Sequence, residues 1–470
     1  MLEFLEYKVA KILIFILNVK FSIQTDFSFR YGHGFMKKLY NFENLYGFDM
    51  GAILLKNIVA EGVVSDVLLN DGLIGRIVPA GEYVALPEGV EVVDCEGKTL
   101  MPGLINMHTH AGMALMRGVG EDIPFHEWID RIWVLEKNLD EEYVYYATKV
   151  ACLEMIKTGT TTFNDQYWYM PAAYKAASEL GLRAALSYVF LDKNDPEESE
   201  RQKEQCQEMY DASRKWADTA QLVISIHAIY SVREHMILWA TEFARKHGLK
   251  IHIHVSETEK EIKDCMEQHG GMSPVEYLDS LGVLGPDVIA AHTLWLSDKD
   301  IEILAKRGVT CVHNVNSNLK LSSGYKFRYN ELRDAGANVC LGTDGCASSN
   351  NLDMLETMKT AAIVQKAWRN DPAAMPLNEL MSMATSNAAK ALGLNAGKIE
   401  EGALADLLII DTDNHNFLSP GSFEANLVYS AHSDCVDSVI CNGKFIMRNR
   451  VVPGEKEILA QARRVLNRIG

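Results

Sequence analysis

The sequence predicts an α/β fold in which a (β/α)8 TIM barrel is joined to a small β-sandwich module. Eight apolar runs recur in the middle of the chain, helical patterns separate them, and glycine-rich β-like segments lie on both sides of this region. Eight β/α units in this length are typical of a TIM barrel. A doubly wound sheet is the alternative, but no glycine-rich phosphate-binding fingerprint accompanies any unit.

The predicted barrel covers residues 102–395. Its strand candidates are short apolar runs, as buried parallel strands are. They are 103–109, 160–165, 183–190, 221–228, 249–256, 287–293, 309–315 and 337–344. Helical patterns lie between them, and several end at glycine, as helices commonly do. The clearest are 141–159, 231–248, 296–308 and 352–370.

Both flanks of the barrel contribute to the predicted β-module, through residues 50–101 and 396–453. Alternating apolar residues and glycine-rich turns indicate short strands in both segments, and a helix at 454–470 closes the chain. Residues 1–49 are expected to be an N-terminal extension outside the fold, with a targeting segment as the alternative. The apolar stretch 9–19 is interrupted and too short to span a membrane, so no membrane association is expected.

Composition excludes several classes of function. The 470 residues carry a net charge of −17 without a long basic run, and such a surface repels nucleic acid. The nine cysteines form no CxxC pair, which argues against a disulfide framework or a thiolate zinc site. A reducing cytoplasm fits this cysteine usage. We also expect a homo-oligomer.

Ionisable side chains gather where the predicted strands end. The chain has 14 histidines, and six candidate residues or pairs follow strand ends. In chain order they are His108 with His110, His227, His254 with Glu257 just beyond, His292, His313 and Asp344. Barrel active sites form at the carboxyl ends of the strands, so these side chains are expected to share one site. Any one of them alone could be an ordinary polar residue.

Two of these histidines, His108 and His110, are separated by one residue, which places both on one face of a strand. Together with His254 and Asp344 they would form a His-His-His-Asp set for a divalent ion, with zinc favoured over iron(II). Such a site keeps one position for a water whose pKa the metal lowers. Glu257 follows at the distance expected of a proton shuttle, although an ordinary surface glutamate is the alternative.

Two further features of the sequence concern the surroundings of this site. His252 shares a face with His254 one layer deeper and is expected to be a core or supporting histidine. Asp344 lies in the sequence GTDG, where glycines allow the backbone to approach closely.

The segments PGLINMHTH, IHIHVSET, AAHT, HNVNSNLKL and GTDGCASSNN together resemble the amidohydrolase superfamily. Within it, the sequence is most similar to the 5-methylthioadenosine/S-adenosylhomocysteine deaminases, with the chlorotriazine hydrolases nearby. The resemblance covers about residues 51–453. It implies a barrel with a β-module from both chain ends. It also implies metal-dependent deamination of an adenosine-type nucleoside, which releases an inosine-type product and ammonia.

The resemblance also implies roles by position. The metal ligands would be His108, His110, His254 and Asp344. Asp344 would take a proton from the attacking water, His292 would orient and polarise that water, and Glu257 would carry a proton to the purine ring. Glu136 would hold the ribose hydroxyls and His227 would contact the substrate, as would Glu257 and Asp344.

One segment departs from the family pattern. Members that accept S-adenosylhomocysteine are expected to offer arginines to its carboxylate after the third strand. Here Tyr188 ends that strand, an acidic loop follows, and Arg201 is the remaining, distant candidate. An acidic loop repels a carboxylate, which favours a neutral 5′-modified adenosine such as methylthioadenosine or 5′-deoxyadenosine. A triazine, guanine or pterin hydrolase is the alternative, and a catalytically inactive scaffold relative is a weaker one.

Overall fold

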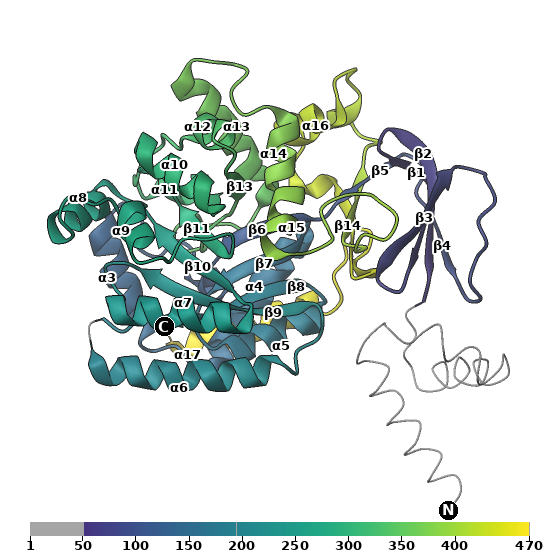
Figure 1. Cartoon of the computed structure of the whole chain (residues 1–470). Helices are drawn as coiled ribbons and strands as arrows, with labels where there is room; N and C mark the ends of the chain where they lie inside the picture. Colours follow the sequence, from purple (N-terminus) through teal and green to yellow (C-terminus); the bar gives the residue numbers. More distant parts are fainter. Residues whose placement is uncertain (1–50, 194, 470) are drawn as a thin grey trace, which may run out of the picture. The chain divides into compact units, whose positions relative to one another are not determined.

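The computed structural model describes residues 51–193 and 195–469, which form two β-sheets, one of them surrounded by helices (Figure 1). The extension predicted at residues 1–49 lies outside these ranges. Within them, no helix is both long enough and apolar enough to cross a membrane.

The eight strands predicted for the barrel all form, and they pair in parallel in their order along the chain. They are β6 Leu104–Thr109, β7 Thr160–Gln166, β8 Arg183–Phe190, β9 Ala220–Ala228, β10 Lys250–Val255, β11 Val288–His292, β12 Thr310–His313 and β13 Asn338–Leu341. Their side chains are almost all buried, as expected of strands covered on both sides. The backbone N–H of Asp344, just past β13, donates to the carbonyl of His108 (2.9 Å) and brings the two ends of the sheet together. The sheet is a nearly closed barrel, which confirms the predicted fold class.

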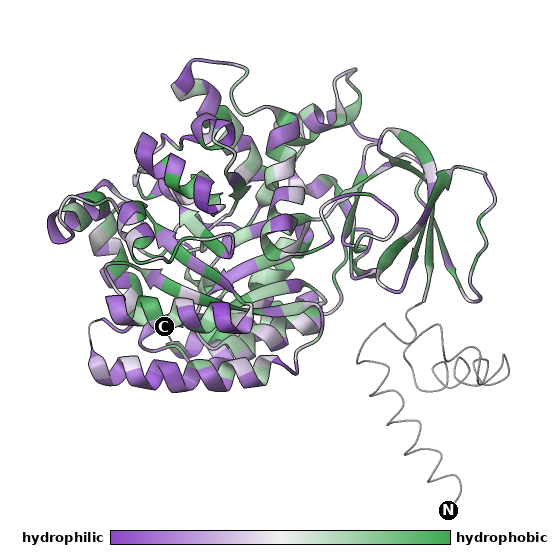
Figure 2. Cartoon of the chain, in the orientation of Figure 1, coloured by the Kyte–Doolittle hydropathy of each residue, from purple (hydrophilic) through white to green (hydrophobic). Residues whose placement is uncertain are grey.

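Helices occupy the connections between these strands. They are α3 Phe125–Glu136, α4 Glu141–Lys157, α5 Met170–Leu180, α6 Pro196–Ser213, α7 Glu234–His247, α8 Glu259–Gln268, α9 Pro274–Ser280, α10 Asp298–Arg307, α11 Val315–Lys320, α12 Tyr329–Asp334, α13 Met354–Arg369, α14 Leu377–Met383 and α15 Ser386–Leu392. Helices α7 and α10 end at Gly248 and Gly308, which adopt the left-handed conformation that glycine tolerates. Helix α6 is hydrophilic along most of its length (Figure 2).

Strands from both chain ends form the second, mixed sheet. They are β1 Ile53–Ala60, β2 Val63–Asn70, β3 Leu73–Pro79, β4 Glu91–Asp94, β5 Lys98–Pro102, β14 Leu407–Asp411, β15 Val436–Cys441 and β16 Lys444–Met447. Strand β5 pairs with β14 and so links the two ends. Apolar side chains of both ends, including Leu55, Ile74, Ile409 and Ile440, pack in one cluster. This packing is compatible with the predicted sandwich, and the domain boundaries stay a prediction.

Short helical elements and a terminal helix complete the second half of the chain. These include a 3-10 turn His415–Phe417 before the other three, which are α16 Phe423–Ala425, a π-helical turn Asn426–Ser430 and a 3-10 turn Ser433–Cys435. Helix α17 Glu455–Ile469 lies where the closing helix was predicted and joins α4 through an ion pair between Lys157 and Glu455 (2.9 Å).

A buried ion pair connects the barrel to the mixed sheet. The Arg183 guanidinium at the start of β8 donates to Asp406 (Nε to Oδ2, 2.7 Å), and both side chains are at least 94% buried. Replacing Arg183 by methionine leaves a buried carboxylate without its partner. We expect the free energy of unfolding to fall by about 3–5 kcal/mol, measured by urea denaturation.

The control for this prediction is Arg76→Met, because Arg76 makes an exposed pair with Glu401 and such pairs contribute about 0–1 kcal/mol. The double variant Arg183→Met with Asp406→Leu should regain much of the lost stability, since it removes both charges. Equal losses for Arg183→Met and Arg76→Met would refute the importance of the buried pair.

Candidate metal centre and substrate pocket

Histidines from three strands and one aspartate meet at the carboxyl end of the barrel. Two groups of three side chains each bring their nitrogen or oxygen ligand atoms within 4.8 Å of one another. They are His108 with His254 and His292, and His108 with His110 and Asp344. His108 belongs to both groups and is fully buried. The strand ends therefore place the sequence-predicted residues around one point.

Hydrogen bonds on the far side of the rings orient two of these histidines. His110 Nδ1–H donates to the carbonyl of Gln166 (2.5 Å), and His254 Nδ1–H donates to the carbonyl of His227 (2.7 Å). A carbonyl can only accept, so Nδ1 carries the proton and the Nε2 lone pair remains for an ion.

The third imidazole, His108, is supported from behind by His252 (Nδ1 to Nε2, 2.9 Å), which is fully buried as expected. The Nε2 atom of His108 is buried without a hydrogen-bond partner within the described ranges. An unpaired buried nitrogen facing other ligand atoms fits a divalent ion, because metal coordination would satisfy it.

Asp344 supplies the carboxylate of this centre. Its Oδ1 lies 3.1 Å from His110 Nε2 and 3.4 Å from His108 Nε2. Burial alone would raise the pKa of Asp344, but its contacts with these two histidines hold the pKa well below the ordinary value. A Cβ added to Gly342 would lie 2.8 Å from the His108 backbone, and one added to Gly345 would lie 3.0 Å from His110 Cβ. The close approach predicted for GTDG is confirmed.

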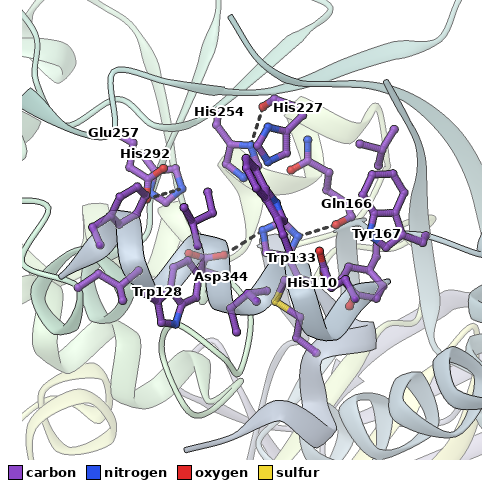
Figure 3. A pocket seen from close by; sticks show the side chains of 18 of the residues that line it. His110, Trp128, Trp133, Gln166, Tyr167, His227, His254, Glu257, His292 and Asp344 are labelled. Carbon is purple, nitrogen blue, oxygen red and sulfur yellow. Dashed lines mark hydrogen bonds and ion pairs between the residues drawn. The ribbon is translucent and has the colours of Figure 1, made fainter. Parts of the chain in front are cut away.

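Glu257 and His292 face each other beside the metal ligands (Figure 3). The Glu257 Oε1 atom lies 3.8 Å from His292 Nε2. Glu257 is 92% buried, and burial raises the pKa of its carboxyl. A carboxyl with a raised pKa beside a reacting centre is suited to carrying protons. The backbone N–H of Glu257 donates to Glu261 (2.7 Å), which fixes this turn of the chain.

One wall of the pocket beside these residues is formed by a single helix, α3. Six α3 residues with helical spacing line it: Phe125, Trp128, Ile129, Ile132, Trp133 and Glu136. The aromatic and aliphatic members offer a flat apolar surface, and Glu136 offers a carboxylate whose pKa is raised by burial. On the opposite side, burial lowers the pKa of His227 to about 3, so its imidazole is neutral at pH 7. The sequence-predicted residues Glu136 and His227 therefore line the same pocket as Glu257.

A groove continues from this pocket toward α6. Trp133 and Glu136 line both the pocket and the groove, and Tyr188 lines the groove at the end of β8. Arg201, which seemed distant in the sequence, also lines the groove because α6 folds back over the end of β8. Its guanidinium forms an ion pair with Glu198.

Sequence reasoning singled out one histidine that does not join the site and missed several residues that do. His313 ends β12, but its ring stacks on Phe327 with centroids 4.1 Å apart and does not line the pocket. The α3 stripe was missed, although its aromatic residues at helical spacing were a readable signal. Ser317 and Asn318, which contact Asp344 and His292, lie in the quoted segment HNVNSNLKL without a signal of their own.

A parallel (β/α)8 barrel that collects histidines and an aspartate at its strand ends, with an acid/base carboxyl beside them, defines a divalent-metal-dependent hydrolase. Residues 99–446 match the Amidohydrolase family. The chain belongs to this family.

Individual relatives agree with this assignment. The chain is 44% identical over 373 residues to the 5′-deoxyadenosine deaminase of Methanoregula boonei, covering 79% of this chain and 84% of the relative. It is also 44% identical over 358 residues to the 5-methylthioadenosine/S-adenosylhomocysteine deaminase of Thermococcus sibiricus, covering 76% and 84%. The crystal structure of an adenosine deaminase from Xanthomonas campestris with bound zinc superposes with a TM-score of 0.83 at 31% identity, covering 89% and 98%.

Proposed function

We propose that this amidohydrolase deaminates an adenosine-type nucleoside with a neutral 5′ group, such as 5′-deoxyadenosine or methylthioadenosine, to the inosine analogue and ammonia. The observation that carries the proposal is the pocket itself. It brings together side chains proposed as metal ligands, Glu257, an apolar wall from α3, and the half-buried carboxyl of Glu136, which also lines the groove. A flat purine fits the apolar wall, and a carboxylate suits the ribose hydroxyls.

The proposed ligands are His108, His110, His254 and Asp344, and we propose zinc over iron(II) because a similar structure contains zinc. When bound, the ion supplies a water molecule whose pKa is lowered toward neutrality. Asp344 takes the proton of that water, and His292 Nε2 holds the water in place for attack on the carbon that bears the amine. Glu257 donates a proton to the neighbouring ring nitrogen, Asp344 passes its proton to the amine, which leaves as ammonia, and the hydroxyl of the adduct returns a proton to Glu257 as the carbonyl forms.

The groove supports a neutral 5′ group. Three cations line it, Arg201, Lys137 and Lys193; Arg201 is paired with Glu198 and Lys193 lies over the Trp133 ring (3.9 Å), while Glu198 and Glu208 add negative charge. We expect kcat/KM for 5′-deoxyadenosine and methylthioadenosine to exceed that for S-adenosylhomocysteine by at least about tenfold. The reason is that the carboxylate of S-adenosylhomocysteine would be repelled by the glutamates of the groove. Ammonia release across this set measures it, and comparable rates on S-adenosylhomocysteine would contradict the preference.

A variant tests the stated reason for this preference. Glu198→Gln removes the partner of Arg201, so kcat/KM for S-adenosylhomocysteine should rise by about 2–5-fold, the value of one exposed ion pair. Its effect on methylthioadenosine should be negligible. An equal change for both substrates would show that the Arg201 charge does not select the 5′ group.

The expected homo-oligomer also remains a prediction. Light scattering on the purified protein measures its mass directly.

A further inference from the structure

Helix α11 touches two residues of the proposed reaction although the strand before it supplies no metal ligand. It follows β12 at the carboxyl end of the barrel, and Ser317 and Asn318 are consecutive residues on it. Both side chains are at least 99% buried. Ser317 contacts Asp344, and Asn318 contacts His292. One short helix therefore contacts both Asp344 and His292, the two residues that act on the attacking water in the proposed function.

The Asn318 contact concerns the proton on the His292 ring. The Asn318 carbonyl oxygen Oδ1 lies 2.8 Å from His292 Nδ1. An amide oxygen can only accept, so His292 Nδ1 carries the proton and Nε2 is left as an acceptor toward Glu257 and the pocket. A histidine with the opposite tautomer would present N–H to the pocket and could not accept a hydrogen bond from the water.

The Ser317 contact concerns rotation of the Asp344 carboxylate. The Ser317 hydroxyl donates to Asp344 Oδ2 (2.6 Å), while Oδ1 accepts from the Gly345 backbone N–H (2.8 Å) and faces His108 and His110. With each oxygen bonded to a different donor, the carboxylate has one preferred orientation.

We infer that Asn318 and Ser317 are positioning residues, which hold His292 in the Nδ1–H tautomer and hold Asp344 with Oδ1 toward the metal ligands. The kinetic consequence rests on the proposed function and the zinc affinity on its proposed ligand set, whereas the tautomer rests on neither. The two asparagines of α11 provide a matched comparison. Asn318 faces the site, and Asn316 on the same helix instead donates to Glu356 on α13 (3.4 Å).

The first experiment compares Asn318→Leu, Asn318→Asp and Asn316→Leu. Leucine keeps the volume of Asn318 but accepts no hydrogen bond, so kcat should fall by about 10–100-fold, the usual effect of losing such a supporting group. Aspartate keeps an accepting oxygen and should retain most of the activity. Asn316→Leu should match the unsubstituted enzyme. Equal losses in Asn318→Leu and Asn316→Leu would overturn the proposal.

The second readout needs no substrate. In protein labelled with nitrogen-15 histidine, the signals of His292 are identified by their absence in His292→Asn. The unsubstituted protein should show a protonated Nδ1 and an unprotonated Nε2, and Asn318→Leu should lose this pattern while keeping its circular dichroism spectrum. An unchanged tautomer in Asn318→Leu, or Nε2–H in the unsubstituted protein, would overturn the proposal. If no nucleoside is deaminated but the tautomer shifts as expected, the proposed substrate is wrong and the positioning role stands.

Ser317→Ala tests the other half with zinc alone as the probe. The dissociation constant for zinc should increase about 10–100-fold, measured by competition with a chromophoric chelator. An unchanged zinc affinity would refute the role of Ser317.

Discussion

Replacing Glu257 by glutamine is expected to lower kcat by about 10²–10⁴-fold, the usual contribution of a group that transfers protons in the transition state. Glutamine has nearly the same shape but cannot exchange a proton. Because Glu257 is buried beside His292 and is not among the metal-ligand groups, the variant should keep its metal. Deamination of 5′-deoxyadenosine, with metal content measured on the same sample, tests both statements.

Glu259→Gln is the matched control for this variant. Glu259 lies two residues further on, in the exposed first turn of α8, and pairs with Lys263 (2.8 Å). It should turn over normally. Near-normal kcat in metal-loaded Glu257→Gln would exclude the proton-transfer role of Glu257.

Removing the metal is expected to abolish measurable activity and to lower the melting temperature. The ligand atoms of His108, His110 and Asp344 then lie close together without an ion, and the buried Nε2 of His108 has no hydrogen-bond partner in the described part of the chain. A ligand bound to the folded state at 100 times its dissociation constant contributes about 2.7 kcal/mol of stability, and chelation removes this contribution. Dialysis against a chelator, followed by activity assay and thermal unfolding, measures both effects.

Adding metals back to the dialysed protein identifies the ion. Zinc should restore activity at one equivalent per chain, and iron(II) is the alternative to test under anaerobic conditions. Full activity in protein shown to contain no metal would refute the proposed ligand set. Calcium, which prefers oxygen ligands, serves as the negative control.

The sequence by itself was enough to predict the barrel and the cluster of side chains that we propose as metal ligands. Strands buried on both faces appear as continuous apolar runs, and all eight predicted runs became strands. The ligands could be predicted because parallel strands end at one edge of a barrel. Residues as far apart as His108 and Asp344 therefore had to meet there once the strands were identified.

Local patterns could not predict which groups surround those ligands. His313 ends a strand as His292 does, yet it packs against Phe327 while His292 faces Glu257. The difference arises from how far each strand extends and how the next loop turns, which depends on packing between distant segments.

Arg201 and Asn318 illustrate what only the tertiary structure decided. In the sequence, Arg201 was remote from the end of its strand, and only the folding of α6 over β8 brings it to the groove, paired with Glu198. Asn318 is one of several asparagines in its segment, and only the backbone path of α11 aims its oxygen at His292. The sequence determined which reactive side chains are present and, through the apolar pattern of the strands, that they lie at the strand ends. The tertiary structure decided which partner each side chain has, because hydrogen bonds depend on distances of a few tenths of an ångström that no local pattern encodes.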